Sequence, residues 1–509
     1  MLSVFILLPF LGITLIFLLP TPLATQARTV ALSILGALLL WSAVILTQFD
    51  ASLAGFQLEE GFSWLEGLGL SYRLSVDGLS LPLLILNGLL TLVAVYCSAP
   101  EIHRPKLYYS MLLLIYTGVA GAFLADNTIL FFLFYELELI PLYLLIAIWG
   151  GTRRSYAATK FLIYTAVSGI LILAGFLGLG WLSGSSSFNY EAGLGSSLPL
   201  GPQFILLTTL LVGFAIKLPL VPFHTWLPDA HVEASTPVSI LLAGVLLKLG
   251  TYGLLRYCLG LFPEAWAIAA PALATWSVIS VLYGSVNAIA QTDMKKMVAY
   301  SSIGHMGFVL LACAANTSIS LLGTLFQMVS HGMISALMFL LVGVVYTKTG
   351  TRDLRVLRGL LNPECGLPIV GTLMIVGVMA SAGLPGMMGF VSEFLVFRGS
   401  FGNFPIQTLL CMVGTAFTSV YFLLLVNRAL FGRLAIEPGV EPGKQDFVLP
   451  PVHWKEYVPG LALAGVIIWG GLQPNLILQM SEATLENFIV SPSLELAQLT
   501  PEAHSALVP

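Results

Sequence analysis

The stretch AIKLPLVP at residues 215–222 places a lysine and two prolines inside an apolar run long enough to cross a bilayer. Residues 381–386, SAGLPG, repeat the Leu-Pro step far along the chain, again within an apolar run. Proline removes a backbone donor and kinks a helix, so each stretch predicts a broken membrane helix. Prolines are also common in membrane helices, and an ordinary structural kink is the alternative interpretation.

The composition around these stretches is that of a membrane protein. Of 509 residues, 57% are hydrophobic and only 9% are charged, and the mean hydropathy is +0.94. Soluble domains carry about 25% charged residues, so an ordinary globular protein is excluded. A net charge of −4 without a dense basic stretch argues against nucleic-acid binding. The five cysteines form no Cys-x-x-Cys pair, and no Walker A loop or dinucleotide fingerprint is present.

Apolar runs of about 20 residues mark the expected membrane crossings. The sequence predicts an all-α membrane protein of about 14 helices, because an open sheet is not viable in lipid and barrel-type alternation is absent. No basic residue precedes the first run, which favours a retained helix over a secretory signal. The expected helices cover residues 1–20, 28–48, 76–97, 107–125, 128–149, 156–182, 203–224, 235–257, 269–291, 298–315, 318–346, 368–397, 406–430 and 458–479.

The two broken segments are the seventh and twelfth in this order. Two five-helix repeats, helices 4–8 and 9–13, place the breaks at matching positions, and the odd number of helices inverts the second repeat. Such matching breaks point to an ion path in transporters. The expected organisation is N-terminal helices in 1–106, a first repeat in 107–257, a second in 258–430, and a loop, helix 14 and tail in 431–509.

Basic residues indicate the orientation, because lysine and arginine gather on the inner side of a membrane. With the N-terminus outside, the inner connections hold most of the 21 lysines and arginines. The outer connections hold only Arg73, Arg256 and Arg398. This contrast predicts an even number of crossings with both termini outside.

Six ionisable residues inside the expected spans are the candidate functional residues: Glu136, Lys217, Lys248, His305, His331 and Glu393. A charge at the bilayer centre costs about 2.5–3.5 kcal/mol or more and is seldom idle. Burial moves the pKa values of lysines and carboxyls toward neutrality, which suits a relay of protons along ordered water. Glu138 points about 200° away from Glu136 on a helix, so one of the two is expected to face the path.

Two other interpretations of these residues stay open. In the first, they form inter-helix salt bridges or hydrogen bonds that only hold the bundle together; in the second, the histidines bind a metal. No His-x-x-x-His pair occurs within a span. The spread of acids, lysines and histidines over the fifth to twelfth spans favours the relay.

Several stretches resemble the antiporter-like subunits of respiratory complex I and of its photosynthetic relative. The likeness spans residues 70–435. Glutamate at position 393 is typical of the fourth core subunit, the M/D type. The sequence ELELIP at 136–141 resembles the cyanobacterial and chloroplast form of that subunit. The matching stretches are FYELELIP at 134–141, KLP at 217–219, HTWLPDAH at 224–231, LLK at 246–248, QTDMK at 291–295 and SIGHMG at 302–307.

The resemblance implies a role for each candidate residue. Glu136 and Lys217 are the expected coupled pair, Lys248 and the histidines the central relay, and Glu393 the terminal site. This chain is expected to hold no redox centre. Ferredoxin or NAD(P)H would supply electrons remotely, iron–sulfur clusters would lie in partner subunits, and plastoquinone would accept the electrons. The expected partners are other membrane-arm subunits and the lipid bilayer, in a thylakoid membrane with both termini lumenal.

One departure from the family pattern is GMMGFVS at 386–392, where small residues are usual. It favours a divergent isoform of the kind found in cyanobacterial complexes for inorganic-carbon uptake. Two rival functions stay open. A stand-alone cation/proton antiporter would show sodium-dependent transport, and a membrane platform for a soluble carbon-hydrating partner would tolerate loss of its buried charges.

Overall fold

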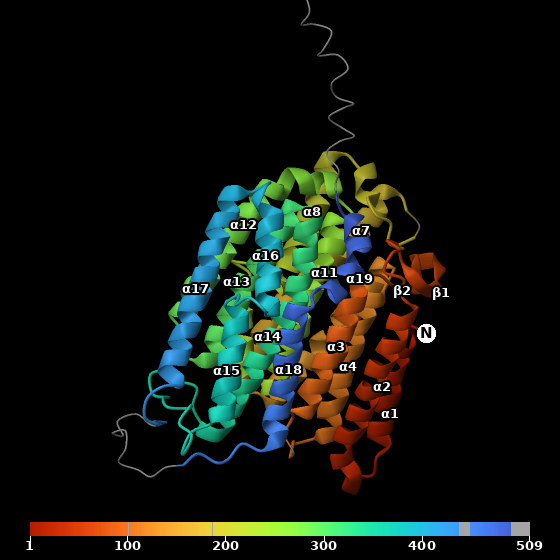
Figure 1. The fold of residues 1–509 in the computed structure, drawn as a ribbon. Helices are drawn as coiled ribbons and strands as arrows, with labels where there is room; N and C mark the ends of the chain where they lie inside the picture. Colours follow the sequence, from red (N-terminus) through yellow and green to blue (C-terminus); the bar gives the residue numbers. More distant parts are fainter. Residues whose placement is uncertain (100, 186, 437–447, 490–509) are drawn as a thin grey trace, which may run out of the picture.

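The apolar runs fold as helices that lie side by side along a common direction (Figure 1). The computed structural model describes residues 1–99, 101–185, 187–436 and 448–489. Helices occupy every apolar run that the sequence predicted. Their bounds are α1 Val4–Leu18, α2 Ala27–Gln48, α3 Ser80–Tyr96, α4 Pro105–Leu124, α5 Thr128–Leu137, α6 Leu139–Trp149, α7 Arg154–Ser183, α8 Leu200–Lys217, α9 Trp226–Glu233, α10 Thr236–Leu241, α11 Leu247–Gly253, α12 Pro263–Ile289, α13 Met294–Ala315, α14 Ser318–Thr349, α15 Pro368–Ser381, α16 Met388–Phe401, α17 Pro405–Ala429, α18 Trp454–Leu472 and α19 Asn475–Glu486.

Length and composition identify a multi-pass membrane protein. With continuous pieces joined, 10 helices of the described chain are long and apolar enough to cross a membrane. The pair α18 and α19, bent by 65° at Gln473 and Pro474, makes an eleventh if it is one span. The apolar helices α1, α3 and α15 are shorter than 18 residues. The sequence predicted about 14 crossings. The difference from 10 corresponds to α1, α3, α15 and the bent pair of α18 and α19.

The expectation of an all-α fold is wrong in one connection. Strands β1 (Gln57–Leu65) and β2 (Leu70–Val76) form an antiparallel hairpin between α2 and α3, with Phe62 opposite Tyr72. The two rings stack with centroids 5.1 Å apart. The open edges of a two-stranded sheet need water as a hydrogen-bond partner, so such a hairpin suits a connection outside the hydrocarbon.

Three segments form the centre of the bundle. These are Thr236–Leu259, α13 and α14. In the most apolar 18-residue stretch of each, 100%, 94% and 94% of the residues are buried, compared with 33% in the corresponding stretches of α2 and α17. The first segment contains α10, α11 and two π-helical turns, η4 (Leu242–Leu246) and η5 (Leu254–Leu259). Ionisable side chains on these segments are therefore enclosed by protein.

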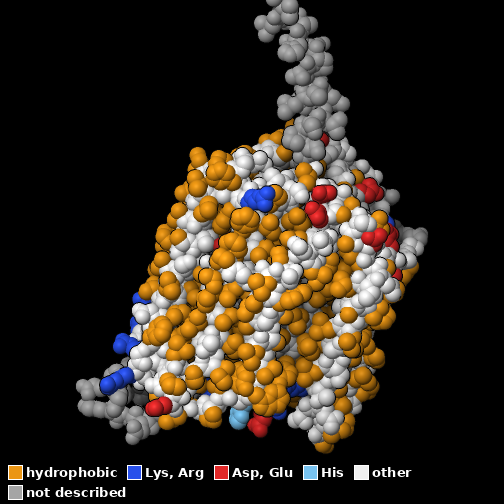
Figure 2. Space-filling view, in the orientation of Figure 1, with side chains coloured by type: hydrophobic (Ala, Val, Ile, Leu, Met, Phe, Trp, Pro, Cys, Tyr) orange, Lys and Arg blue, Asp and Glu red, His pale blue; other side chains and the backbone are white. Residues whose placement is uncertain are grey.

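The surface has charged ends and an apolar middle. Figure 2 shows a broad hydrophobic band, with most charged side chains near its upper and lower limits. The Met1 ammonium pairs with Glu60, and Asn487 Nδ2 donates to the Ala54 carbonyl at 3.1 Å. The beginning of the chain and the end of α19 thus contact the same connection, between α2 and α3, and lie on one side of the band.

Candidate functional site

Lys217 is the last residue of α8, where the predicted break begins. Its ammonium pairs with Glu138 Oε1, and the two side chains are 2% and 0% exposed. The ammonium also lies 4.4 Å from the centre of the Tyr135 ring. A basic residue in the last turn interacts favourably with the helix dipole. The resemblance implied Glu136 as the partner of Lys217; in the structure the ion pair is formed with Glu138 instead, and a role of Glu136 in coupling stays a prediction.

Helix geometry explains why the pairing involves Glu138. The fifth predicted span is divided at Glu138 into α5 and α6. Pro141, three residues later, cannot donate the backbone bond that would continue the helix across this point. Glu136 is half-buried on the other face, and its carboxylate contacts Gly169 of α7 so closely that a Cβ there would overlap it.

Hydrogen bonds connect the first break to the helices around it. Tyr135 Oη lies 3.2 Å from Ser168 Oγ, which donates to the Gly213 carbonyl at 2.7 Å. Trp226, at the start of α9, donates its indole N–H to the Ile216 carbonyl at 2.8 Å. The break is thus held by partners on α5, α7 and α9, and Lys217 extends from a fixed helix end.

Lys248 lies in the centre of the bundle, in α11 between the two π-helical turns. Its Nζ donates to the Ala243 carbonyl at 2.7 Å and lies 2.8 Å from His331 Nδ1. Lys248 is 0% exposed and His331 5%. A π-helical turn displaces carbonyls from the regular ladder, and such turns are frequent at functional sites. Here the carbonyl five residues before Lys248 accepts a hydrogen bond from its ammonium.

His331 leads on to the second break. Its ring centre lies 5.4 Å from that of His305 on α13. His305 Nδ1 donates to the Ser301 carbonyl at 2.8 Å, and its Nε2 lies 3.9 Å from Glu393 Oε1. All three side chains line a small cavity with a volume of about 10 Å³. This is room for about one water molecule beside polar groups.

The second break positions Glu393. Helix α15 ends at Ser381 and α16 begins at Met388, so residues 382–387 connect the halves. Gly383 has φ +73°, and a Cβ on it would lie 2.9 Å from Glu393 Oε2. The unusual methionines, Met387 and Met388, pack against glycines 470 and 471 of α18. The Met388 side chain meets Gly470, and the Met387 backbone meets Gly471.

The structure brings the candidates together in two groups. Lys248, His331, His305 and Glu393 form one continuous series of contacts. Lys217 belongs to a separate group with Glu138, while Glu136 lies outside both contact series. The two groups are joined through packed helices: a Cβ on Gly250 of α11 would lie 2.9 Å from the backbone nitrogen of Leu218.

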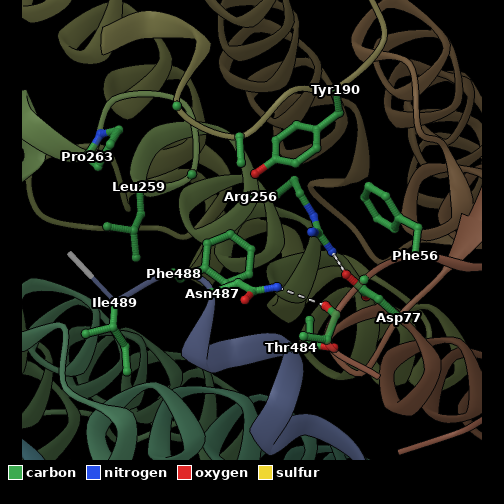
Figure 3. A pocket seen from close by; sticks show the side chains of 15 residues that line it. Phe56, Asp77, Tyr190, Arg256, Leu259, Pro263, Thr484, Asn487, Phe488 and Ile489 are labelled. Atoms are coloured by element: carbon green, nitrogen blue, oxygen red, sulfur yellow. Dashed lines mark hydrogen bonds and ion pairs between the residues drawn. The ribbon is translucent and has the colours of Figure 1, made fainter. Parts of the chain in front are cut away.

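Sequence reasoning missed a buried ion pair at the end of the bundle that holds the hairpin. Arg256 pairs with Asp77, and both are nearly fully buried. Figure 3 shows the guanidinium directed at Asp77, with Tyr190 and Phe56 beside it, at a cavity of about 520 Å³. Each residue lies within two positions of the end of an expected span, where a single charge is ordinary. The sequence signal that could have found the pair is that these two span ends lie on the same side of the membrane, where opposite charges can meet.

A second missed carboxylate lies nearby. Asp126, 2% exposed in the connection between α4 and α5, pairs with Arg73 Nε at 2.8 Å. Burial raises the pKa of Asp126 to about 6, against the opposing effect of Arg73.

At the start of α13, Lys295 is 4% exposed and lines a cavity of about 280 Å³ with Glu233 and Arg352.

The remaining histidines of the matching stretches pack against rings. His231 stacks on Phe339 with centroids 4.3 Å apart, and His224 meets Tyr283 edge-on at 4.9 Å. Within the described residues, no group of three or more His, Cys, Asp or Glu is placed to hold a metal ion.

Comparisons with known proteins agree with this geometry. Residues 125–418 match the transmembrane family described as NADH:quinone oxidoreductase/Mrp antiporter. NAD(P)H-quinone oxidoreductase chain 4-2 of Synechocystis sp. is 43% identical, over 85% of this chain and 78% of its own length. Chain 4 2 of Thermosynechococcus vestitus is 40% identical, over 95% and 90%.

A solved structure gives the same answer for the fold. A chain of respiratory complex I from Thermus thermophilus with bound NADH superimposes with a TM-score of 0.83 and 27% identity, covering 96% of this chain and 100% of that one. The resemblance found in the sequence is thereby confirmed, together with its chain 4 assignment. The chain belongs to the NADH:quinone oxidoreductase/Mrp antiporter family of transmembrane proteins, and both cited relatives are cyanobacterial chain 4 subunits.

Proposed function

We propose that this chain translocates protons as a chain 4-type membrane-arm subunit of a complex I-like NAD(P)H-quinone oxidoreductase. The observation that carries the proposal is the series Lys248–His331–His305–Glu393, enclosed in the most buried part of the bundle. Each member can hold and release a proton, and Lys217 with Glu138 adds a second such group. Groups of this kind inside a membrane mark proton relays.

The energy for transport is expected from electron transfer in partner subunits. Moving one charge against 100 mV requires about 2.3 kcal/mol. In this proposal the chain contributes protonatable residues and no redox centre. Iron–sulfur clusters lie in partner subunits, plastoquinone accepts the electrons, and other membrane-arm subunits cover part of the lipid-facing surface. The two cited relatives are cyanobacterial, which supports a thylakoid location.

The proposed topology has 14 crossings, with both termini on the lumenal side. It joins α5 with α6, α15 with α16, and α18 with α19, and counts α1 and α3 as short spans. Met1 and Asn487 contact the same connection, which supports an even number. Two inverted five-helix repeats, in 107–257 and 258–430, place the α8 and α15 ends at matching positions. Helices before residue 107 and after 430 flank them.

The rival functions differ in what they predict. The family description includes the Mrp antiporter, which keeps a stand-alone cation/proton antiporter as the alternative. That alternative requires sodium-dependent transport by the chain in isolation. A platform for a carbon-hydrating partner, in a carbon-uptake isoform, requires normal carbon uptake after the buried charges are removed.

The test is donor-driven proton uptake in membranes that carry Lys217→Ala, with the abundance of the complex measured in parallel. Lost uptake at normal abundance supports the pump. Unchanged uptake at normal abundance contradicts it and favours the platform. Loss of the whole complex means that Lys217 holds the bundle together, and Lys248→Met is then the variant that decides.

A further inference from the structure

The cavity beside Lys295, called the Lys295 cavity below, lies at the end of the bundle opposite the hairpin. Helix α12 begins at Pro263, which lines the cavity at Arg256, and ends at Ile289, shortly before α13. The Lys295 cavity has a volume of about 280 Å³. Its walls come from the α6–α7 and α9–α10 connections, the start of α13 and the last turns of α14. Four segments that are distant in sequence therefore meet at one small cavity.

The carboxylates near this cavity already have cationic partners. Glu233 Oε1 lies 3.7 Å from Arg153 Nε, and Glu233 Oε2 accepts from the Arg153 backbone N–H at 2.8 Å. Asp293 Oδ2 lies 3.4 Å from Arg352 Nε, while its Oδ1 caps α13 by accepting from two backbone N–H groups. Each carboxylate is thus committed to one arginine, and Lys295 adds a third positive charge.

Lys295 itself forms no ion pair. Its side chain is 4% exposed, and no carboxylate oxygen of the described residues lies within 4 Å of its ammonium. The ammonium donates to the Ala234 carbonyl at the end of α9, and Arg352 donates to the Val232 carbonyl of the same helix. A helix C-terminus carries about half a negative charge, which here serves two cations. Because a buried charge without compensation is strongly unfavourable, the cavity favours an anion.

We propose that the Lys295 cavity binds a compact oxyanion, held by the Lys295 ammonium and the Ser235 hydroxyl. An ammonium has three donors, and Lys295 uses one of them on Ala234. Ser235 also lines the cavity. Pockets for drug-sized ligands measure about 300–1,000 Å³, so the smaller Lys295 cavity suits an ion or a lipid phosphate group rather than a nucleotide. The bound anion joins the walls of the cavity, a role that is independent of proton translocation.

The experiment titrates the intact complex in neutral detergent with inorganic phosphate and follows the thermal unfolding midpoint. A ligand that binds only the folded state raises the midpoint. Phosphate also strengthens apolar burial in general, but without a specific site. We expect a saturating rise in the wild type and in Lys296→Met, the matched control one residue along α13. Lys295→Met is expected to lose the saturating part. A wild type without it, or an identical titration of Lys295→Met, overturns the proposal.

A second variant decides if Lys295→Met does not assemble. Ser235 makes no side-chain cap on α10, so Ser235→Ala is expected to keep the fold. Its half-saturating phosphate concentration should rise about tenfold, the effect of one hydrogen bond to a charged group. An unchanged concentration overturns the role of Ser235 and, with no assembled Lys295→Met, the site itself.

Reconstitution identifies the source of the oxyanion. The wild type and Lys295→Met are placed in phosphatidylcholine bilayers with and without phosphatidylglycerol, which offers the same phosphate oxygens on a lipid. A midpoint rise with phosphatidylglycerol in the wild type alone, together with loss of the phosphate titration, supports a lipid headgroup in the cavity. A phosphate titration that persists in phosphatidylglycerol supports a free anion. If neither additive distinguishes the wild type from Lys295→Met, the proposal is wrong.

Discussion

Lys248 Nζ lies 2.8 Å from His331 Nδ1 in the most enclosed part of the molecule. The same ammonium donates to the Ala243 carbonyl at 2.7 Å. Both neighbours are uncharged acceptors when His331 is neutral with its proton on Nε2, so in that tautomer the lysine proton can be transferred to Nδ1 without a change in heavy-atom positions. His305 and Glu393 continue the contacts beyond it.

Replacing Lys248 is therefore expected to interrupt the relay. Lys248→Met keeps most of the volume and removes the proton-carrying group, and His331→Gln removes the acceptor. Each is expected to lower donor-driven proton uptake by about 100-fold, the lower range for a positioned acid or base. Uptake and quinone reduction are measured in the same vesicles, with abundance of the complex. Lys296→Met, at the start of α13, is the control; wild-type uptake in Lys248→Met contradicts the relay.

Gly383→Ala tests the second break. Gly383 has φ +73°, and a Cβ would lie 2.9 Å from Glu393 Oε2. The left-handed backbone alone costs about 1–2 kcal/mol for an L residue. We expect a lower thermal midpoint and lower proton uptake, because the methyl displaces the carboxylate. Gly465→Ala in α18 is the control, since nothing lies within 4 Å of its Cβ and helix propensity favours alanine by about 1 kcal/mol. Equal behaviour of the two variants would show that Glu393 does not depend on Gly383.

Sequence patterns predicted the helices and their breaks because both follow from local chemistry. Apolar length gives the runs, and the Leu-Pro steps give the breaks after Lys217 and before Glu393. The buried positions of Lys217 and Lys248 followed in the same way, since each lies in mid-run. The fold of the family then supplied the order of these residues along a path.

Other features depend on tertiary packing and were not predictable. Whether Glu136 or Glu138 meets Lys217 is decided by the helix division at Glu138, and a two-residue spacing alone leaves the choice open. The π-helical turns around Lys248 arise from packing of a fully buried segment. The β1–β2 hairpin is the exception, because residues 70–76, LSYRLSV, alternate strictly between apolar and polar side chains, a strand pattern that the sequence analysis overlooked. Asp77 and Arg256 are far apart in sequence, and each is ordinary at a span end.

The stability of the connection at Asp126 is expected to depend on pH. Burial raises its pKa from 3.8 to about 6. A carboxyl with a raised pKa in the folded state binds its proton more tightly when folded, so its contribution to stability is full below about pH 4 and is lost as the pH rises through 6. Asp126→Asn resembles the protonated form. The midpoint difference between variant and wild type should therefore shift in favour of the variant as the pH rises from about 4 to 7.

Asp50→Asn is the control for this measurement. Hydrogen bonds from Ser52 lower the pKa of Asp50, so this carboxyl stays ionised across the same range. Its midpoint difference from wild type should be independent of pH. A flat difference for Asp126→Asn as well would mean that Asp126 is as hydrated as Asp50.

The buried pair Asp77–Arg256 is expected to contribute to stability without carrying protons. Asp77 Oδ1 accepts from the backbone N–H groups of Leu79 and Ser80 at 3.1 and 2.9 Å, and Oδ2 pairs with Arg256. Asp77→Asn keeps this cap, because asparagine caps as well as aspartate, but it leaves the guanidinium uncompensated. Removing one partner of a buried ion pair costs about 3–5 kcal/mol.

The double variant Asp77→Asn/Arg256→Met removes the stranded charge and is expected to recover most of that loss. Thermal midpoints of the wild type, both single variants and the double variant form the cycle, and proton uptake per quinone reduced is measured on each complex that assembles. Uptake should stay at the wild-type ratio, since the pair contacts neither group of the candidate path. If the single and double variants are equally unstable, the aromatic rings around Arg256, and not the charge of Asp77, account for its contribution.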